Sequence, residues 1–300
     1  MKRTYLSVLV ILIMGFATWY FFIKPYDYLV SFKVNTYPGV VNQTIKTWSN
    51  TMENSKIIKS DDVYHIEQQL NFSDKILRYN WVISPISDST SKVNVYITDI
   101  KNSLKNKARI PFFETTFEKD TRERLLDFNK NLKLHLSDFK VKVVGREKLK
   151  SSYIMYIPIK TTQLQKAAGM MSTFPILDNL MTSNSDVIKS DGRPFLEITY
   201  WNQKNDSLHY NFCYPIIKTD SLPKGTEINY KYFKEGDMLK AVYNGNYITS
   251  DRAWYKLLDY AKDKRIEIIK KPIEVFFNNP NFGGDALEWK TEVFLPLKIE

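Results

Sequence analysis

The sequence predicts an α+β protein in which two soluble domains follow a single membrane-spanning helix. Three observations carry this prediction: an uncharged run near the N-terminus, an order of strands and helices typical of a sheet with a long closing helix, and an internal repeat in the second half. The chain has 300 residues, of which 43% are hydrophobic and 25% charged. These values are typical of a globular chain with about two domains.

The N-terminal segment has the length and composition of a transmembrane helix. A short tail, residues 1–4, carries Lys2 and Arg3, and residues 5–23 then contain no charge. About 20 apolar residues span a hydrocarbon core of roughly 30 Å. Trp19 begins an aromatic cluster suited to the membrane interface. A cleaved signal peptide is the alternative, but the run is long and no small-x-small cleavage site precedes the aromatic cluster.

The charges that flank this segment predict its orientation. Lys2 and Arg3 precede the span and only Lys24 directly follows it. Because positive charges concentrate on the cytoplasmic side, the N-terminus is expected in the cytoplasm of a bacterial cell. The protein would then be a single-pass protein of the cytoplasmic membrane, with both soluble domains on the outer, periplasmic side. Its first expected partner is the lipid bilayer, through residues 5–23.

The remaining charge is dispersed. The net charge is +10 but no long basic run occurs, and we find no helix-turn-helix signature. Dispersed positive charge favours a soluble surface or contact with anionic headgroups over a nucleic-acid footprint. No nucleic-acid partner is therefore expected.

The first soluble domain is expected over residues 24–145. An alternating strand at residues 26–35 precedes a helix that follows Pro38. Further strands are expected at residues 63–72, 75–84 and 91–102. A helix of about 20 residues comes next, at 117–139, and its apolar stripe must be buried. That stripe consists of Leu125, Phe128, Leu132 and Leu136.

This order of elements, over roughly residues 26–140, resembles the START-like (polyketide cyclase and dehydrase, SRPBCC) helix-grip fold. The resemblance implies that the last helix lies across a curved sheet and encloses an apolar cavity. Another α+β sandwich is the alternative.

The second domain, residues 146–300, contains an internal repeat. A segment from Gly192 aligns with one from Lys270, so that Pro194 matches Pro272. Each copy is preceded by a strand and a helical segment. These are residues 151–162 and 170–181 in the first copy, where Pro175 interrupts or starts the helix, and 238–245 and 250–264 in the second, where Ser250 is the expected N-cap. Two such βαββ units can pair about a pseudo-twofold axis, each with a helix over one sheet face and the other faces meeting at a cleft.

Three motifs of the second repeat resemble those of the GyrI-like (AraC-type effector-binding) domain. They lie in the runs AVYNGNYITSDRAWYKLLDYAKDKRIEI, KPIEVFFNNP and EWKTEVFLPL. The motif residues are Gly245-Asn246-Tyr247, Asn278-Asn279-Pro280, and Thr291, Glu292 and Pro296. Asn246 replaces the usual proline, and the turn at 278–280 lacks the acid often found there. The resemblance covers about residues 147–300.

This resemblance implies a function. Members of the family bind small, often cationic and aromatic molecules in the cleft between the repeats. They commonly form the sensing half of transcription regulators, and a minority hydrolyse reactive cyclopropane-bearing compounds.

Strand periodicity places Glu292 and Phe294 on the face opposite Thr291 and Val293. We expect the helix to cover the second pair and the cleft to receive the first. A buried carboxylate needs a partner; a cationic ligand would supply one, and aromatic rings would add about 0.5–2 kcal/mol each. The expected ligand-binding residues are Glu292, Phe294, Tyr243, Phe276, Tyr232, Tyr230, Tyr156 and Trp201. The first repeat has Asn211 in place of Glu292. Lys290 offers the alternative of a simple surface ion pair with Glu292.

Other chemistry is sparse. The three histidines lack metal-ligand spacing, and Cys213, the only cysteine, lies in a strand that is expected to be buried. No catalytic residue, metal or cofactor is therefore expected.

The expected function is that of a membrane-anchored protein which captures a small, apolar, cationic molecule in an aromatic cleft with a central carboxylate. One alternative is a hydrolase of reactive electrophilic or lipid-like compounds, in which Glu292 orients water beside a tyrosine donor. The sequence offers no nucleophile–base pair, so binding is favoured over catalysis. The other alternative is an envelope scaffold that binds protein partners, which would gain support if the protein's own side chains filled the cleft.

Overall fold

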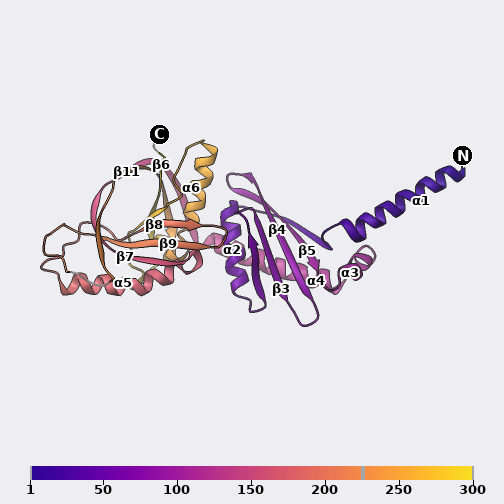
Figure 1. The fold of residues 1–300 in the computed structure, drawn as a ribbon, viewed down its shortest axis with the longest axis horizontal. Helices are drawn as coiled ribbons and strands as arrows, with labels where there is room; N and C mark the ends of the chain where they lie inside the picture. Colours follow the sequence, from indigo (N-terminus) through magenta and orange to yellow (C-terminus); the bar gives the residue numbers. More distant parts are fainter. Residues whose placement is uncertain (1, 224–226, 299–300) are drawn as a thin grey trace. The chain divides into compact units, whose positions relative to one another are not determined.

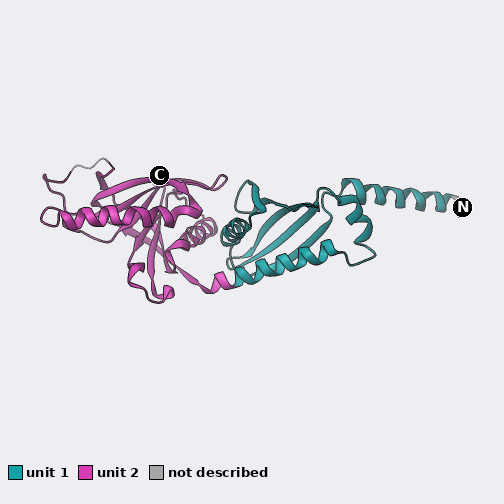
Figure 2. Cartoon of the chain, turned by 90° about the horizontal axis from the view of Figure 1, so that it is seen from below, with its two compact units in different colours: residues 1–133 teal, residues 134–300 magenta. Residues whose placement is uncertain are grey.

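The computed structural model describes residues 2–223 and 227–298. The chain folds as two compact units, residues 1–133 and 134–300 (Figure 2). This division lies twelve residues before the end of the first domain expected from the sequence. The reason is that β6, Phe139–Leu149, pairs with β11, Gly236–Gly245, in the sheet of the second unit. The side chains of Lys2 and Arg3, on which the predicted orientation rests, lie outside the described part.

The apolar N-terminal segment forms one continuous helical rod (Figure 1). The α-helix α1, Lys2–Thr18, continues into a π-helical turn, η1, Trp19–Ile23. Within the described residues, Thr4–Ile23 is the one helical stretch long and apolar enough to cross a membrane, with a mean hydropathy of 2.3. No residue of its most apolar 18-residue window is buried in the described structure.

The first unit is built on a five-stranded antiparallel sheet with the strand order β1-β5-β4-β3-β2. The strands are β1 Tyr28–Val34, β2 Ser55–Ser60, β3 His65–Asn71, β4 Ile76–Ser87 and β5 Thr90–Asp99. Helix α2, Pro38–Asn50, connects β1 to β2, and α3, Ser103–Arg109, and α4, Thr116–Ser137, follow β5. The predicted elements are all present, whereas β2 and α3 were missed because both are short and rich in lysine.

An aromatic cluster joins helices α2 and α4 to the sheet of this unit. The ring of Phe128 on α4 lies 5.3 Å from Trp48 on α2 and 5.0 Å from Trp81 on β4, between centroids. Phe128 and Trp81 are completely buried. The predicted stripe on α4 is confirmed for Leu125, Phe128 and Leu132, which are buried, and Leu136 is half-buried.

The second unit is built on an eight-stranded antiparallel sheet with the order β10-β7-β9-β8-β12-β13-β11-β6. The strands not yet given are β7 Ser152–Thr162, β8 Phe195–Asn202, β9 Ser207–Pro215, β10 Asn229–Phe233, β12 Ile273–Phe276 and β13 Lys290–Pro296. Helix α5, Lys166–Ser183, belongs to the first repeat and α6, Arg252–Asp263, to the second.

Two expectations about these helices are wrong. Pro175 neither starts nor interrupts α5, which runs through it. Ser250 is not the N-cap of α6; that position is Asp251. The hydroxyl of Ser250 instead donates to the carbonyl of Tyr247 at 2.9 Å, and it also lies 2.9 Å from the carboxylate of Glu274.

The strand register confirms the predicted equivalence of Glu292 and Asn211. Strands β8 and β12 pair at the centre of the sheet, with Leu196 opposite Glu274. One residue further along β12, Val275 pairs with Glu292, and at the matching position of β8, Glu197 pairs with Asn211. The two βαββ repeats are thus related by a pseudo-twofold axis between β8 and β12.

The two faces of this sheet are both occupied. Thr291, Val293 and Leu295 are buried on the face that carries the helices, as predicted. The opposite face is strongly curled, because Phe195 on β8 meets Phe233 on β10 at 5.1 Å although two strands separate them. A core cluster fills this concave face: Ile154, Phe195, Cys213, Phe233, Met238, Ile273 and Phe294. The cleft predicted between the inner faces of the repeats is therefore filled there by the protein's own side chains.

Replacement of Phe128 by alanine is expected to destabilise the first unit by about 3–5 kcal/mol, because it removes the ring at the centre of the aromatic cluster. Urea unfolding followed by tryptophan fluorescence measures the change. Phe113→Ala, at a side chain that is 70% exposed, is the matched control and should change the free energy of unfolding by less than about 0.5 kcal/mol. Equal effects of the two variants would contradict the central role of Phe128.

Candidate ligand-binding site

Glu292, the expected centre of the site, lies between two lysines. Its carboxylate is 2.6 Å from the ammonium of Lys290 and 3.0 Å from that of Lys240 on β11. Its side chain is 16% exposed. Burial acts to raise the pKa of Glu292, but the hydrogen bonds from Lys290 and Lys240 outweigh it and hold the pKa below its ordinary value. The carboxylate already has its cationic partners within the chain.

The same arrangement recurs at the pseudo-symmetric position. Glu197 accepts a hydrogen bond from Asn211 at 2.7 Å and one from Lys231 at 2.6 Å. Each repeat therefore carries one carboxylate on the concave face, next to the apolar cluster. Lys231 on β10 neutralises Glu197, and Lys240 on β11 with Lys290 on β13 neutralises Glu292. The asymmetry predicted from Asn211 is smaller than the sequence suggested, because Glu197 supplies the acid one strand away.

The other expected site residues are dispersed. Phe294 is buried in the concave cluster, and Tyr156 packs against it. Tyr243 is buried on the helix face and its hydroxyl lies 2.7 Å from Thr249 Oγ1. Tyr230 and Tyr232 lie on the edge strand β10, on either side of the ring of Tyr153.

Trp201 packs at 5.0 Å against Trp254, and its indole N–H donates to Gln163. Of the eight predicted residues, Phe276 alone lines the cavity described next.

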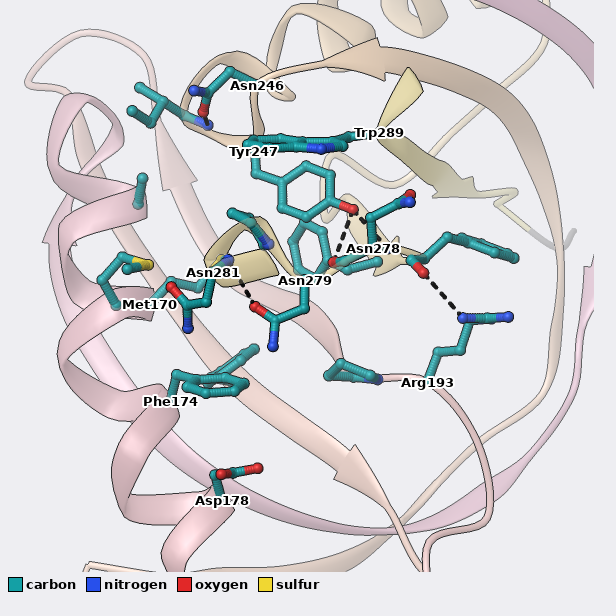
Figure 3. A pocket seen from close by; sticks show the side chains of 18 residues that line it. Met170, Phe174, Asp178, Arg193, Asn246, Tyr247, Asn278, Asn279, Asn281 and Trp289 are labelled. Carbon is teal, nitrogen blue, oxygen red and sulfur yellow. Dashed lines mark hydrogen bonds between the residues drawn. The ribbon is translucent and has the colours of Figure 1, made fainter. Parts of the chain in front are cut away.

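A cavity of about 470 Å³ lies on the helix side of the second unit (Figure 3). Helix α5 forms one wall, through Met170, Met171 and Phe174. The facing wall comes from the second repeat and consists of Asn246–Ile248, Phe276–Asn281 and Trp289. This volume lies within the range of about 300–1,000 Å³ typical of small-molecule sites.

Tyr247 connects two of the motifs noted in the sequence, those at residues 245–247 and 278–280, at this cavity. Its hydroxyl accepts a hydrogen bond from the backbone N–H of Asn278 at 2.9 Å and donates to the carbonyl of the same residue at 3.1 Å. Its ring lies 4.8 Å from Phe276 and 5.8 Å from Trp289. Gly245 makes the turn possible: its φ is +153°, and a Cβ there would come within 2.6 Å of the Tyr243 hydroxyl.

Asparagine side chains fix the polar rim. The carboxamide oxygens of Asn246, Asn278 and Asn279 each accept a backbone N–H, from Ile248, Lys290 and Asn281 respectively, at 2.9–3.0 Å. These bonds hold the loops in shape. Because each carboxamide oxygen accepts one of these bonds, the amide nitrogen is the donor end of each side chain.

Opposite charges lie at two places on the cavity margin (Figure 3). Arg193 donates to the carbonyl of Phe277 at 3.2 Å and lies over its ring at 4.3 Å. Asp178, on α5, is an exposed carboxylate. Among the described residues, no ion pair is found for the Asp178 side chain.

A fully buried ion pair joins the two walls beneath the cavity. The ammonium of Lys166, at the start of α5, lies 2.7 and 2.8 Å from the two carboxylate oxygens of Glu274 on β12, and both side chains are completely buried. Lys166 also donates to Ser250 at 2.7 Å. Burial, the largest influence, raises the pKa of Glu274, and Lys166 and Ser250 oppose it. The pair thus connects α5 of one repeat with β12 of the other and with the turn at residues 246–250, which we call the Tyr247 turn.

A second buried network lies beside α6. Arg252 donates to both oxygens of Asp251 at 3.0 and 3.1 Å, and its Nε–H donates to His135 Nε2 at 3.1 Å. Burial and the positive charge of Arg252 lower the pKa of His135 to about 4, while Asp251 acts in the opposite direction. His135 is therefore neutral at pH 7 and acts as an acceptor.

Comparison with known proteins gives likenesses of fold at low identity. No protein-family model matches the chain, and no curated protein matches it. The crystal structure of the EcmrR C-terminal domain is similar at a TM-score of 0.45 and 12% identity, covering 54% of this chain and 99% of that one. The structure of SAV2435 bound to tetraphenylphosphonium is similar at a TM-score of 0.37 and 12% identity, covering 52% of this chain and 94% of that one.

Glu274→Gln is expected to lower the free energy of unfolding of the second unit by about 3–5 kcal/mol, because it leaves the Lys166 ammonium buried without a counter-charge. Urea unfolding measures the loss. Glu267→Gln is the control: the Glu267–Lys298 pair is 72% and 64% exposed, so solvent screens it and its loss should leave the unfolding transition almost unchanged. A double variant, Lys166→Met with Glu274→Leu, should recover much of the loss; failure of the single variant to destabilise would contradict the role of the pair.

Below pH 6.5 the second unit should lose stability through His135. The unfolded chain takes up a proton at this residue near pH 6.5 but the folded chain only near pH 4, so the stability contributed by neutral His135 is present above pH 6.5 and is lost as the pH falls to 4. The limit is about 3 kcal/mol. The measurement is the free energy of unfolding as a function of pH, for the wild type and for His135→Gln, which keeps an acceptor for Arg252. Between pH 6.5 and 4 the slope should be steeper for the wild type, and above pH 7 the two slopes should be equal. Parallel profiles at low pH would contradict the assignment.

Proposed function

We propose that the protein is a membrane-anchored receptor that binds a small, apolar, aromatic and cationic molecule in the cavity between α5 and the Tyr247 turn. The observation that carries the proposal is the cavity itself: about 470 Å³, walled by methionine and aromatic side chains and rimmed by fixed amides. Ligand sites in proteins commonly combine such apolar walls with a few well-placed polar groups.

The charges on the margin support a cationic ligand. Asp178 is the exposed carboxylate of the margin, whereas Arg193 already lies over Phe277. The rings of Tyr247 and Trp289 offer a further attraction to a cation, since their faces carry negative charge density. We therefore propose Asp178 on α5, and not Glu292 on β13, as the carboxylate that attracts the cation, because Lys240 and Lys290 neutralise Glu292.

The anchor is proposed from the helix Thr4–Ile23. Its length suits a hydrocarbon core of roughly 30 Å, and Trp19 and Tyr20 lie at its C-terminal end, where an aromatic belt is expected. We keep the orientation expected from the flanking charges, with the N-terminus in the cytoplasm and both units on the outer side. Protease digestion of sealed right-side-out vesicles should then remove both units.

For the first unit we propose a helix-grip arrangement, the START-like fold expected from the sequence. The order β1-α2-β2-β3-β4-β5 with a long helix after the last strand supports it. A second cavity, of about 410 Å³, lies between α2, β3 and α4 and is bordered by Trp48, Met52, Leu70 and Phe72. The Trp48, Trp81 and Phe128 rings take up the centre of the unit.

A protein-binding scaffold is the second candidate. The observation in its favour is the concave face of the second unit, which carries its own apolar cluster and offers no cleft at Glu292. One measurement separates the two candidates. A receptor should bind a small molecule saturably in the α5 cavity, whereas a scaffold should not.

Isothermal titration of the full chain with tetraphenylphosphonium tests the proposal. Trp289→Ala should weaken binding about tenfold, because it removes the ring that closes the cavity. Asp178→Asn should weaken it about two- to fivefold, since an exposed charge contributes up to about 1 kcal/mol. Binding of neutral triphenylphosphine oxide should not depend on Asp178.

Glu292→Gln is the matched control, because it removes a carboxylate from the same unit outside this cavity. It should leave the affinity unchanged. A loss of affinity in Glu292→Gln with none in Trp289→Ala would move the site to the concave face, and absence of saturable binding by the wild type would favour the scaffold.

A further inference from the structure

An apolar and basic surface lies beside the C-terminal end of the N-terminal helix. It is formed by residues 100–113, which include α3, and we call it the 100–113 segment. Phe112 is 77% exposed and Phe113 70%, the largest exposures of any aromatic side chain in the first unit apart from those of the helix itself. Ile100 and Leu104 are 46% and 55% exposed. Two neighbouring phenyl rings in water are unfavourable unless something covers them.

This segment is fastened to the end of the apolar helix. Lys107 on α3 is buried, and its ammonium donates to the carbonyl of Phe21 at 3.3 Å and to that of Lys24 at 2.5 Å. These are among the last carbonyls of the helical rod, where a cation is favoured. The 100–113 segment therefore lies where α1 and η1 end.

Asp27 adds a second attachment. One of its oxygens accepts the hydroxyl of Ser103, at the start of α3, and the other accepts the backbone N–H of Asp99, at the end of β5, at 2.9 Å. Asp27 is 1% exposed. Lys107 thus holds the segment to the carbonyls at the end of the helix, and Ser103 holds it to Asp27, so its position relative to the helix end is built into the fold.

The exposed charges of the segment are all positive. Lys101, Lys105 and Arg109 are exposed, and no ion pair involves them among the residues that the structure describes. The acids nearby are already engaged: Glu114 pairs with Arg122 at 3.1 Å, and Glu118 accepts the N–H and hydroxyl of Thr115. Exposed aromatic rings beside unpaired cations are the composition of a surface that binds an anionic bilayer.

We infer that the 100–113 segment docks onto the bilayer that holds α1, with Phe112 and Phe113 in the interfacial layer and Lys101, Lys105 and Arg109 against anionic lipid headgroups. This inference rests on the proposed anchor. It adds a second, peripheral contact that fixes how the first unit stands on the membrane. The partner of this surface is the lipid bilayer, because Lys107 holds the segment at the end of the apolar helix.

Site-specific fluorescence of the full chain in nanodiscs tests the inference. The environment-sensitive dye NBD is attached in turn at Pro111→Cys in the segment, Met14→Cys in the helix and Ser89→Cys in the β4–β5 turn. That turn lies at the opposite end of the sheet from α3, because β5 runs from Thr90 to Asp99. The wild type is the labelling blank, since its cysteine, Cys213, is completely buried.

Lipids that carry a doxyl quencher report contact with the bilayer. In discs that contain phosphatidylglycerol, the dyes at positions 14 and 111 should be quenched and the dye at position 89 should not. The triple variant Lys101→Gln, Lys105→Gln, Arg109→Gln should lower the docking equilibrium constant at position 111 about a hundredfold, because each cation near an anionic surface contributes about fivefold. Quenching at position 14 should not change in that variant.

The outcomes separate docking from anchoring. Quenching at 14 but not at 111 would overturn the docking inference and leave the anchor standing. Loss of quenching at both positions would overturn the anchor and the inference together. Quenching at position 111 that is as strong in phosphatidylcholine discs, or in the triple variant, as in the wild type with phosphatidylglycerol would overturn the assignment of the cations to headgroups.

Discussion

The buried ion pair of Lys166 and Glu274 is the interaction on which the second unit depends. It is the polar contact at which α5, the central strand β12 and the turn before α6 meet with no access to water. A desolvated lysine and glutamate are tolerable only at short distance and with every remaining hydrogen-bonding group engaged. Ser250 meets that requirement for both. Helix α5 and the Tyr247 turn form opposite walls of the cavity. The Lys166–Glu274 pair sets the distance between these two walls and therefore the dimensions of the cavity.

The two faces of the sheet in this unit carry different kinds of side chain. The helix face carries polar groups that fasten one repeat to the other, whereas the concave face carries an apolar cluster to which both repeats contribute. Curling of the sheet brings Phe195 and Phe233 together and leaves no room between them. The carboxylates of Glu197 and Glu292 border this cluster, and lysines from other strands of the sheet, Lys231 and Lys240, neutralise them. Among the described residues, the cavity of about 470 Å³ lies on the helix face, where the loops of the two repeats differ.

The sequence predicted the elements well because periodicity reports burial, and burial is what fixes strands and long helices. It placed β1, α2 and α4, and it identified Asn211 and Glu292 as equivalent positions of the two repeats. It missed the short lysine-rich β2 and α3, since neither has an apolar period. The candidate site was harder to predict. The motifs around Tyr247 and Asn278 do meet at the cavity, but strand alternation drew attention to Glu292, and it cannot reveal that Lys240, fifty-two residues earlier, points at the same carboxylate.

The attachment of Lys107 to the end of η1 leaves the first unit without a flexible stalk. Only residues 24–27 separate the helix from β1, which at full extension is about 14 Å of chain. With α1 in a bilayer, the cations of α3 would meet lipid headgroups as an intramolecular partner, at an effective concentration in the millimolar range or above. Lipid contacts far too weak to recruit a soluble protein would then be sufficient to set the tilt of this unit. Its orientation would respond to the local supply of anionic lipid, so that membrane composition itself becomes an input to the protein.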